Sequence, residues 1–486
     1  MSSSRRSNRL VLVAVATAVV FLLWHTTGHA DVSRFGRSFA EMGERGFLQG
    51  AQSPFAASGS RPPFVRLSPD SMPNTVWVKG LPGFNYFENL YLHNGTFYAV
   101  VTDPEAVPEV AQIMSDFPDD DGSTHRPAQA DRWEVLVQGR DDLSVLGQVA
   151  VVKSGISMFF NDEKGKNSVS FLKHYFHFRL NSRPGEVFLG AWRVLTTAGE
   201  RELPARLMYR TTPDDWRDHA GLTSWFQQSV MPNTAIEEAS IWEDRAKSGM
   251  TFLFDKITIT DRWAAHAKGE HPKYWNKMTA DLFMLDAPMG WMEPLRQSME
   301  TLALTEGCDV HRKDRNVPVV TYINRQLTGR RLLAADHEGL MEAMEGLHEQ
   351  GVIEFVDAQM ETKSRIEQFC MALRSDVIMG VHGNGLSHAL WMKPGSAMIE
   401  VSVAWFSRTK FSADPFRSCT LDYAMIGELM RHDYYAIHND TVLTPDKWSR
   451  PDGWSIGQNQ GFHGSYIPVH GPFMADLIRE IAAKRR

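Results

Sequence analysis

The feature that most constrains the fold is an alternation of two kinds of segment between residues 317 and 403. Four segments are short, apolar and rich in β-branched residues, as buried strands are: 317–325, 352–358, 377–381 and 397–403. The segments 337–351 and 366–373 instead repeat their apolar residues at helical spacing. Strands that alternate with helices predict a parallel sheet with crossover connections, and therefore an α/β fold.

Polar residues follow directly after these predicted strands. They are Asn324 with Arg325, Asp357, the turn at residues 382–385, and Glu400. In an open parallel sheet, ligands bind beyond the carboxyl ends of the strands. We therefore expect any ligand site of this half to be built from these residues.

The stretch "VIMGVHGNGLSHALWM" places a histidine and two glycines between a strand and a helix expected to start at Leu386. Gly383 and Gly385 would let the backbone approach a ligand closely. The N–H groups and positive partial charge at a helix start suit a phosphate, to which His382 could add a hydrogen bond. The alternative is a tight turn with Asn384 as a cap and a histidine whose hydrogen bonds are satisfied.

Three arginines, Arg325, Arg330 and Arg331, lie in "NRQLTGRR" after an earlier strand. Guanidinium groups match the geometry of phosphate oxygens. The alternative is a solvated basic loop. Glu400 could accept hydrogen bonds from ribose hydroxyls, or it could be an ordinary edge carboxylate.

A chain of 486 residues predicts two domains. In the first half, residues 95–101, 133–139 and 251–260 favour strands, whereas 186–195 and 222–228 favour helices. We place the first domain at 71–300, the second at 301–468 and a C-terminal helix at 469–486.

The N-terminus resembles a targeting segment. Residues 1–9 are basic and would form a cytoplasmic tail, and residues 10–24 are apolar, as in the core of a signal sequence. We expect an uncleaved signal anchor, the alternative being cleavage near Gly28 or Ala30. Residues 25–70 are expected to be a flexible stem. Asn94 and Asn439 head Asn-x-Thr sequons, which predict glycosylation on the lumenal side.

The net charge limits the kinds of binding partner, and the number of cysteines limits the number of disulfide bonds. A net charge of -7 argues against nucleic acid as a partner. Cys308, Cys370 and Cys419 are too few for a disulfide framework, although one bridge and one free thiol remain an alternative. Cys370 lies on the apolar stripe of its helix, which predicts a buried free thiol.

Six stretches in order resemble glycosyltransferase family 61, particularly its fungal members: "GFNYFENLYLHNGTFYAV", "HYFHF…GEVFLGAWR", "FLFDKITITDRWAA", "VVTYINRQLTGRRL", "VIMGVHGNGLSHALWMKPGSAMIEV" and "GFHGSYIPV". The resemblance implies a GT-B architecture, with two Rossmann-like domains facing a cleft. It also implies a single-pass type II protein of the Golgi or endoplasmic reticulum membrane. Such a protein inverts the anomeric centre of a UDP-sugar (xylose, arabinose or N-acetylglucosamine) without a metal or cofactor, and its acceptor is a glycan or glycoprotein.

By this resemblance, residues 382–386, Arg325, Arg330 or Arg331, and Glu400 hold the nucleotide diphosphate, and the C-terminal helix crosses back to the first domain. We expect Glu186 or His177 to be the general base. Seven residues, 179–185, separate the His-Phe pair from Glu186, where the family pattern has two.

Three alternatives remain open. The changed spacing leaves a non-catalytic lumenal relative that binds a nucleotide sugar or glycan. A hydrolase with His382 and His388 as metal ligands would lack a completing ligand cluster. Residues 119–121 have the Asp-x-Asp spacing of metal-dependent transferases, but we expect them to form a solvated loop.

Overall fold

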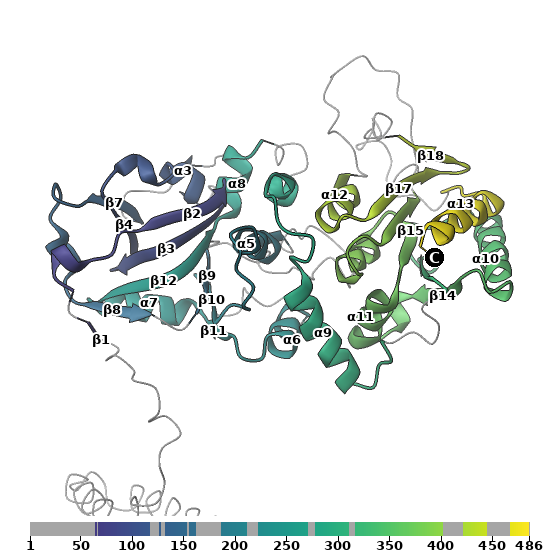
Figure 1. Ribbon diagram of the computed structural model, residues 1–486, viewed down its shortest axis with the longest axis horizontal. Coiled ribbons are helices and arrows are strands. Elements are labelled where there is room, and N and C mark those ends of the chain that lie inside the picture. Colours follow the sequence, from purple (N-terminus) through teal and green to yellow (C-terminus); the bar gives the residue numbers. More distant parts are fainter. Residues whose placement is uncertain are drawn as a thin grey trace, which may run out of the picture. The chain divides into compact units, whose positions relative to one another are not determined.

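The structure of the protein is a computed structural model that describes residues 64–65, 67–116, 126–127, 132–152, 155–161, 186–210, 222–270, 278–310, 316–401, 421–444 and 467–485. Residues 64–486 form one compact unit (Figure 1). The predicted tail and anchor, with most of the stem, lie outside the described residues. Among the helices that are described, none has the length and apolar character needed to cross a membrane.

Ten strands of the described residues form the first sheet. They are β1 (Phe64–Val65), β2 (Val76–Leu81), β3 (Phe84–His93), β4 (Thr96–Val101), β7 (Trp133–Val137), β8 (Val149–Val152), β9 (Ser157–Phe160), β10 (Arg206–Tyr209), β11 (Ala235–Glu237) and β12 (Thr251–Thr260). The main order is β11-β10-β9-β12-β3-β4-β7. The strands β5 (Ser115–Asp116) and β6 (Arg126–Pro127) form a separate small sheet.

The first sheet is mixed, which differs from the parallel sheet expected of a Rossmann-like domain. Strands β11, β10, β9 and β12 run parallel, whereas β12 pairs antiparallel with β3, and β3 with β4. The hairpin from β3 to β4 turns at Asn94-Gly95, where both residues have positive φ. This pair favours a tight hairpin turn and so explains an antiparallel pairing that apolar periodicity alone does not predict.

Helices accompany this sheet along the chain. The α-helices are α3 (Val110–Ile113), α5 (Glu186–Thr197), α6 (Leu222–Val230), α7 (Ala239–Lys247), α8 (Arg262–Lys268) and α9 (Glu293–Thr305), and the short 3-10 helices are η1 (Pro69–Ser71), η2 (Pro104–Ala106), η3 (Leu143–Leu146) and η5 (Met278–Met284). The predicted helices at 186–195 and 222–228 and the predicted strands at 95–101, 133–139 and 251–260 are thereby confirmed.

The second sheet contains the elements predicted from the alternating pattern. Its strands are β13 (Val319–Asn324), β14 (Glu354–Gln359), β15 (Val377–Val381), β16 (Ala397–Val401), β17 (Asp433–His438) and β18 (Thr441–Leu443). Its helices are α10 (Ala334–Glu349), η6 (Met360–Thr362), α11 (Arg365–Arg374), η7 (Asn384–Trp391), α12 (Leu421–Met430) and α13 (Gly471–Lys484). All strand pairs are parallel except β17 with β18.

The strand order β14-β13-β15-β16-β17-β18 contains a topological switch point. The chain leaves β13 toward β14 on one side and then returns to β15 on the other side of β13. Connections that leave in opposite directions open a crevice beyond the carboxyl ends of β13 and β15. This crevice is where the residues that follow these two strands meet.

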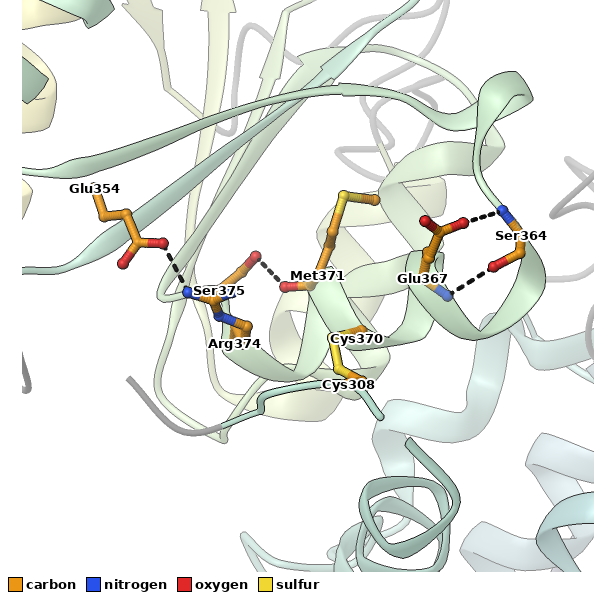
Figure 2. Close-up of a disulfide and its surroundings, with 8 residues drawn as sticks. All are labelled: Cys308, Glu354, Ser364, Glu367, Cys370, Met371, Arg374 and Ser375. Atoms are coloured by element: carbon orange, nitrogen blue, oxygen red, sulfur yellow. Dashed lines mark hydrogen bonds and ion pairs between the residues drawn. A yellow bond between two sulfur atoms is a disulfide. The ribbon is translucent and has the colours of Figure 1, made fainter. Parts of the chain in front are cut away.

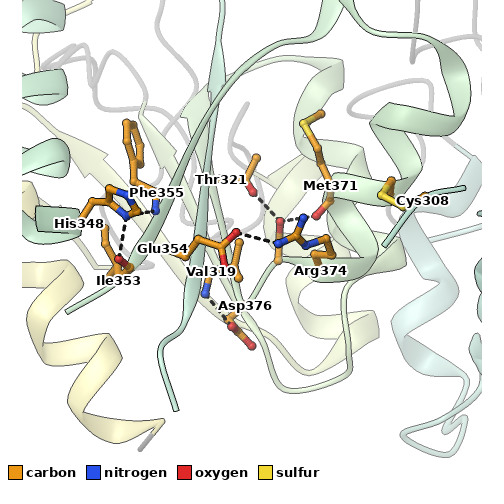
Figure 3. Close-up of polar contacts among 12 residues, drawn as sticks. Cys308, Val319, Thr321, His348, Ile353, Glu354, Phe355, Met371, Arg374 and Asp376 are labelled. Carbon is orange, nitrogen blue, oxygen red and sulfur yellow. Dashed lines mark hydrogen bonds and ion pairs between the residues drawn. A yellow bond between two sulfur atoms is a disulfide. The ribbon is translucent and has the colours of Figure 1, made fainter. Parts of the chain in front are cut away.

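The amino end of the second sheet is tied by side chains that precede or begin its strands (Figure 3). The Asp376 carboxylate accepts a hydrogen bond from the backbone N–H of Val319 at 2.8 Å. Arg374 and Glu354 form an ion pair at 2.7 Å. These contacts fix the register at the edge away from the crevice, as in other parallel sheets whose ligand site is at the carboxyl edge.

The C-terminal helix α13 packs on the second sheet. Its apolar side chains, including Met474, Ile478 and Ile481, belong to the same core as Leu340 and Met344 of α10. A β-carbon on Gly471 would overlap the carbonyl oxygen of Gly339, so the two helices meet through glycine backbones. This packing corrects the expectation that the last helix crosses back to the first domain.

Cys308, which follows α9, and Cys370 of α11 form a disulfide with a Cα–Cα distance of 6.2 Å (Figure 2). The prediction of a buried free thiol at Cys370 was therefore wrong. Cys370 does lie on the apolar stripe, but its sulfur is bonded to the chain segment that precedes β13. Cys419 lies outside the described residues.

Candidate functional site

The candidate site occupies the switch point of the second sheet. Asn324 ends β13 and Arg325 follows it, while His382 follows β15. Because β13 and β15 are neighbours in parallel register, these residues emerge side by side. The sequence predicts that Arg325 and His382 lie at the same edge, and the structure brings them into contact.

Gly383 and Gly385 are required by close packing across the crevice. A β-carbon on Gly383 would overlap Nη1 of Arg325, and one on Gly385 would lie 2.5 Å from Cγ2 of Ile323. Real β-carbons do not approach neighbours this closely. The two glycines therefore let the turn lie directly against β13 and against the arginine that follows it.

Arg325 and Arg330 converge on one backbone oxygen. Nη1 of Arg325 donates to the carbonyl of His382 at 3.3 Å, and Nη1 of Arg330 donates to the same carbonyl at 3.2 Å. Burial lowers the pKa of Arg325, and the charge of Arg330 lowers it further. Two guanidinium groups held together with one carbonyl between them form a strongly electropositive point. Arg331, by contrast, is exposed.

The His382 side chain is set in a buried polar group. Its Nδ1 is hydrogen-bonded to Oε1 of Glu400, and the Tyr434 hydroxyl donates to Oε2 of Glu400 at 2.5 Å. The ring of Tyr423 packs edge-on against the imidazole, with 4.9 Å between the ring centroids. The hydroxyl of Tyr423 also donates to Oδ1 of Asn384 at 3.3 Å. These contacts fix the orientation of the turn's two polar side chains.

The other side chains here support the structure of the turn and of the helix that follows it. Leu386 is fully buried, and its N–H donates to the carbonyl of Gly383 at 2.9 Å. The helix begins at Asn384, two residues earlier than expected, and is a 3-10 helix. It is held by two buried histidines, since His388 bonds to the carbonyl of Gly385 and His432 to that of Ala389, each at 2.9 Å.

The two histidines weighed as metal ligands have different partners, Glu400 for His382 and the Gly385 carbonyl for His388. Across the part of the chain that is described, no group of three or more His, Cys, Asp or Glu residues could hold a metal ion. Residues 119–121 lie outside that part.

A second polar group, which the sequence analysis missed, lies at the carboxyl end of the parallel strands of the first sheet. Strands β10, β9 and β12 end in register, and the residues that follow them are Arg210, Asn161 and Asp261. Arg210 donates to Oδ1 of Asn161 at 3.0 Å, and the Asn161 amide donates to Asp261 at 2.6 Å. The rule used for the second sheet would have found these residues if strands β9 and β10 had been recognised.

Helix α5 connects β9 to β10 and therefore begins at this same edge. Its first residue is Glu186, whose side chain lies outside what the structure describes. His177 and the segment 179–185 also lie outside the described residues.

The sequon residues Asn94 and Asn439 both occupy hairpin turns with positive φ. Asn94 is exposed, and Asn439 is partly buried.

The fold and the site define an α/β protein with a glycine turn and paired arginines at the switch point of a parallel sheet. The family model described as Glycosyltransferase 61 matches residues 175–399, a range that includes α5, this turn and most of the second sheet. This match supports membership of glycosyltransferase family 61, and a domain of this family indicates that the protein is a glycosyltransferase. No curated protein matches it.

Proposed function

We propose that the protein is an inverting glycosyltransferase that moves a sugar from a UDP-sugar to a glycan or glycoprotein without a metal ion. The convergence of Arg325 and Arg330 on the His382 carbonyl carries the nucleotide part of the proposal. Two cations this close repel each other, and a diphosphate between them would relieve the repulsion. A UDP-sugar with xylose, arabinose or N-acetylglucosamine supplies that group.

The nucleotide side is assigned to the turn and its arginines. Arg325 and Arg330 would bind the diphosphate oxygens, with Gly383 and Gly385 allowing the backbone to come close. His382 and Asn384 are oriented by their buried partners and would complete the polar lining. Arg331 is exposed, and we assign it no contact with the diphosphate.

The chemistry is a direct displacement at the anomeric carbon. A base takes the proton of the acceptor hydroxyl while the oxygen of that hydroxyl bonds to the anomeric carbon. The bond from that carbon to the diphosphate oxygen breaks, and its electron pair leaves with UDP. Stabilisation of the charge developing on the diphosphate usually accelerates such a reaction most, and general base catalysis adds about 100-fold to 10,000-fold.

The acceptor side is assigned to the carboxyl edge of the first sheet, in a GT-B arrangement of the two sheets around the reacting sugar. Glu186 begins α5 at this edge, which supports it, or His177 in the preceding segment, as the base. Asp261 fixes the buried amide of Asn161, and the amide oxygen in turn accepts a hydrogen bond from Arg210 and orients its guanidinium. A planar guanidinium with several N–H donors suits the hydroxyls of a glycan.

The disulfide supports a lumenal location. Stable disulfides form in oxidising compartments such as the secretory pathway. Residues 10–24 would anchor the protein as a type II membrane protein of the Golgi or endoplasmic reticulum, with Asn94 and Asn439 available to the lumenal glycosylation machinery.

Thermal unfolding of the full chain with and without excess UDP, repeated in EDTA, tests the nucleotide assignment. A ligand at about 100 times its dissociation constant stabilises the native state by roughly 2.7 kcal/mol. We expect that stabilisation to survive EDTA, to be lost in Arg325→Gln and Arg330→Gln, and to persist in the matched control Arg331→Gln. A wild-type chain that UDP does not stabilise would overturn the proposal.

A second measurement distinguishes an enzyme from a non-catalytic relative. The non-catalytic alternative is favoured by the long segment before Glu186. The three UDP-sugars are incubated with the chain and a mixture of glycan acceptors, and the release of UDP is followed. Stabilisation by UDP together with no release from any donor would identify a nucleotide-sugar-binding protein.

A further inference from the structure

Glu400 is the most deeply buried charged side chain of the candidate site, with no exposed surface. It lies in β16 directly opposite Gly380 of β15, where no side chain competes for the space. On its other side, helix α12 approaches β17 closely, because Gly427 leaves only 3.0 Å between a would-be β-carbon and Cβ of Tyr434. The carboxylate is thus enclosed by the sheet and the helix.

A carboxylate at such a place is costly unless both of its oxygens are paired. Here Oε1 is bonded to Nδ1 of His382, and Oε2 accepts from the Tyr434 hydroxyl at 2.5 Å. Both oxygens are therefore engaged within the protein. This geometry suits a residue that acts through His382 better than one that binds ribose hydroxyls directly.

The environment of His382 is mixed in charge. Glu400 faces its ring nitrogen, and the Tyr423 ring packs against its edge. Arg325 and Arg330 both donate hydrogen bonds to its backbone carbonyl. A carboxylate at Nδ1 fixes the ring orientation and favours the imidazolium, as in other carboxylate–histidine pairs.

We propose that Glu400 and Tyr434 are positioning residues that hold His382 as an imidazolium for the diphosphate, so that UDP binding is linked to a proton on His382. The inference rests on the proposed function and deepens it. The imidazolium would join Arg325 and Arg330 as a third cation on the diphosphate oxygens. Tyr434 would orient the carboxylate and, through it, the ring.

The proposal predicts the direction of a pH effect. The imidazolium donates a charge-assisted hydrogen bond to the diphosphate, and the neutral ring loses the charge. UDP affinity should therefore fall as the pH rises through the titration of His382. Removal of the carboxylate destabilises the imidazolium, so this fall should move to lower pH.

The test is isothermal titration of the full chain with UDP from pH 5.5 to pH 8.5. The terminal phosphate of UDP titrates in this range, but it does so equally for every variant. The comparison is therefore the ratio of each variant's Kd to the wild-type Kd at the same pH. The variants are His382→Gln, Glu400→Gln and Tyr434→Phe, with Tyr435→Phe as the control one residue along the same strand.

We expect His382→Gln to weaken UDP binding about tenfold or more at acid and neutral pH. Glu400→Gln should match that loss near pH 7 but recover most of the affinity at pH 5.5, where acid restores the imidazolium. Tyr434→Phe should show a smaller loss of the same kind, and Tyr435→Phe none. Recovery in acid also shows that the Glu400→Gln chain is folded, and Tyr434→Phe tests the idea if Glu400→Gln does not fold.

Two outcomes would overturn the inference while leaving the proposed function intact. One is UDP binding by Glu400→Gln and Tyr434→Phe with the wild-type Kd at every pH. The other is an equal loss in Glu400→Gln at every pH, which would make Glu400 a direct ligand. Absence of UDP binding by the wild-type chain at all pH values would instead refute the proposed function itself.

Discussion

The guanidinium of Arg325 occupies the space that a side chain at Gly383 would need. Arg325 follows β13 and Gly383 lies in the turn after β15, and the parallel pairing of these strands brings the two residues together. Arg325 can therefore occupy this position only because residue 383 has no side chain. The backbone of Gly383 sets a second condition, because L-residues rarely adopt its φ of 156° and ψ of 170°.

Gly383→Ala should impair both ligand binding and folding. The new methyl group would push the Arg325 guanidinium aside and remove a cation from the diphosphate position, and alanine would be strained at φ 156° and ψ 170°. We expect UDP affinity to fall about tenfold or more, as for a lost charge-assisted hydrogen bond, and the free energy of unfolding to fall by about 1 to 3 kcal/mol through the backbone strain. Calorimetric titration with UDP and thermal unfolding measure the two effects.

Gly329→Ala is the matched control for that substitution. Gly329 lies in the same loop as Arg325 and Arg330, and a β-carbon there meets no atom within 4 Å. Its Kd for UDP should equal that of the wild type. A Gly383→Ala chain that binds UDP normally would show that the position of Arg325 does not matter for the nucleotide.

The core of the second half was predictable because its signals are local. Strand 377–381 is a continuous apolar run, strand 397–401 is apolar except for Glu400, and the stripe of Leu340, Met344 and Leu347 is buried as its spacing predicts. The grouping of Arg325 with the glycine turn also followed, since parallel strands end at one edge. These inferences need only the strand direction and no knowledge of the strand order.

What could not be predicted depends on neighbours distant in the sequence. Tyr434 meets Glu400 only because β17 lies beside β16, and nothing near Glu400 in the sequence indicates that order. Cys308 and Cys370 are separated by 62 positions, and an apolar stripe describes the helix that holds Cys370 but not the segment opposite it. The antiparallel pairing of β12 with β3 is likewise a tertiary choice.

Loss of the disulfide should lower stability substantially. A bridge that closes a loop of this length restricts the unfolded chain by on the order of 4 kcal/mol in the chain-entropy model, and removal of a native bridge commonly costs about 2 to 5 kcal/mol. We expect the double substitution Cys308→Ala with Cys370→Ala to reduce the free energy of unfolding in guanidinium titrations by an amount in this range. Dithiothreitol should destabilise the wild type and leave the double variant unchanged.

Cys419→Ala provides the comparison for that experiment, because Cys419 is not part of the bridge. It should retain the wild-type response to dithiothreitol. Equal stability of the double variant and the wild type would mean that the segment after α9 is held as firmly by packing alone.

The two buried histidines beside the turn should make the protein sensitive to acid. Burial lowers the pKa of His388 from 6.5 to about 3 and that of His432 from 6.5 to about 4. The folded protein therefore keeps both rings neutral at pH values where the unfolded chain binds protons on them. Their contribution to stability is complete above about pH 6.5 and decreases as the pH falls, until it levels off near pH 4 for His432 and near pH 3 for His388. While only the unfolded state is protonated, each ring lowers the free energy of unfolding by about 1.4 kcal/mol per pH unit.

His388→Gln tests this sign directly. Glutamine can still donate to the Gly385 carbonyl but does not titrate. The free energy of unfolding should therefore fall less steeply between pH 6 and pH 4 than in the wild type, and the slopes should differ by about 1.4 kcal/mol per pH unit, the value for one proton. Urea titrations across that range measure the slope. His470→Asn, an exposed position at the start of α13 where asparagine can still cap the helix, should leave the slope unchanged. An unchanged slope in His388→Gln would mean that His388 is already protonated in the folded protein, and that the turn is held by a charged ring.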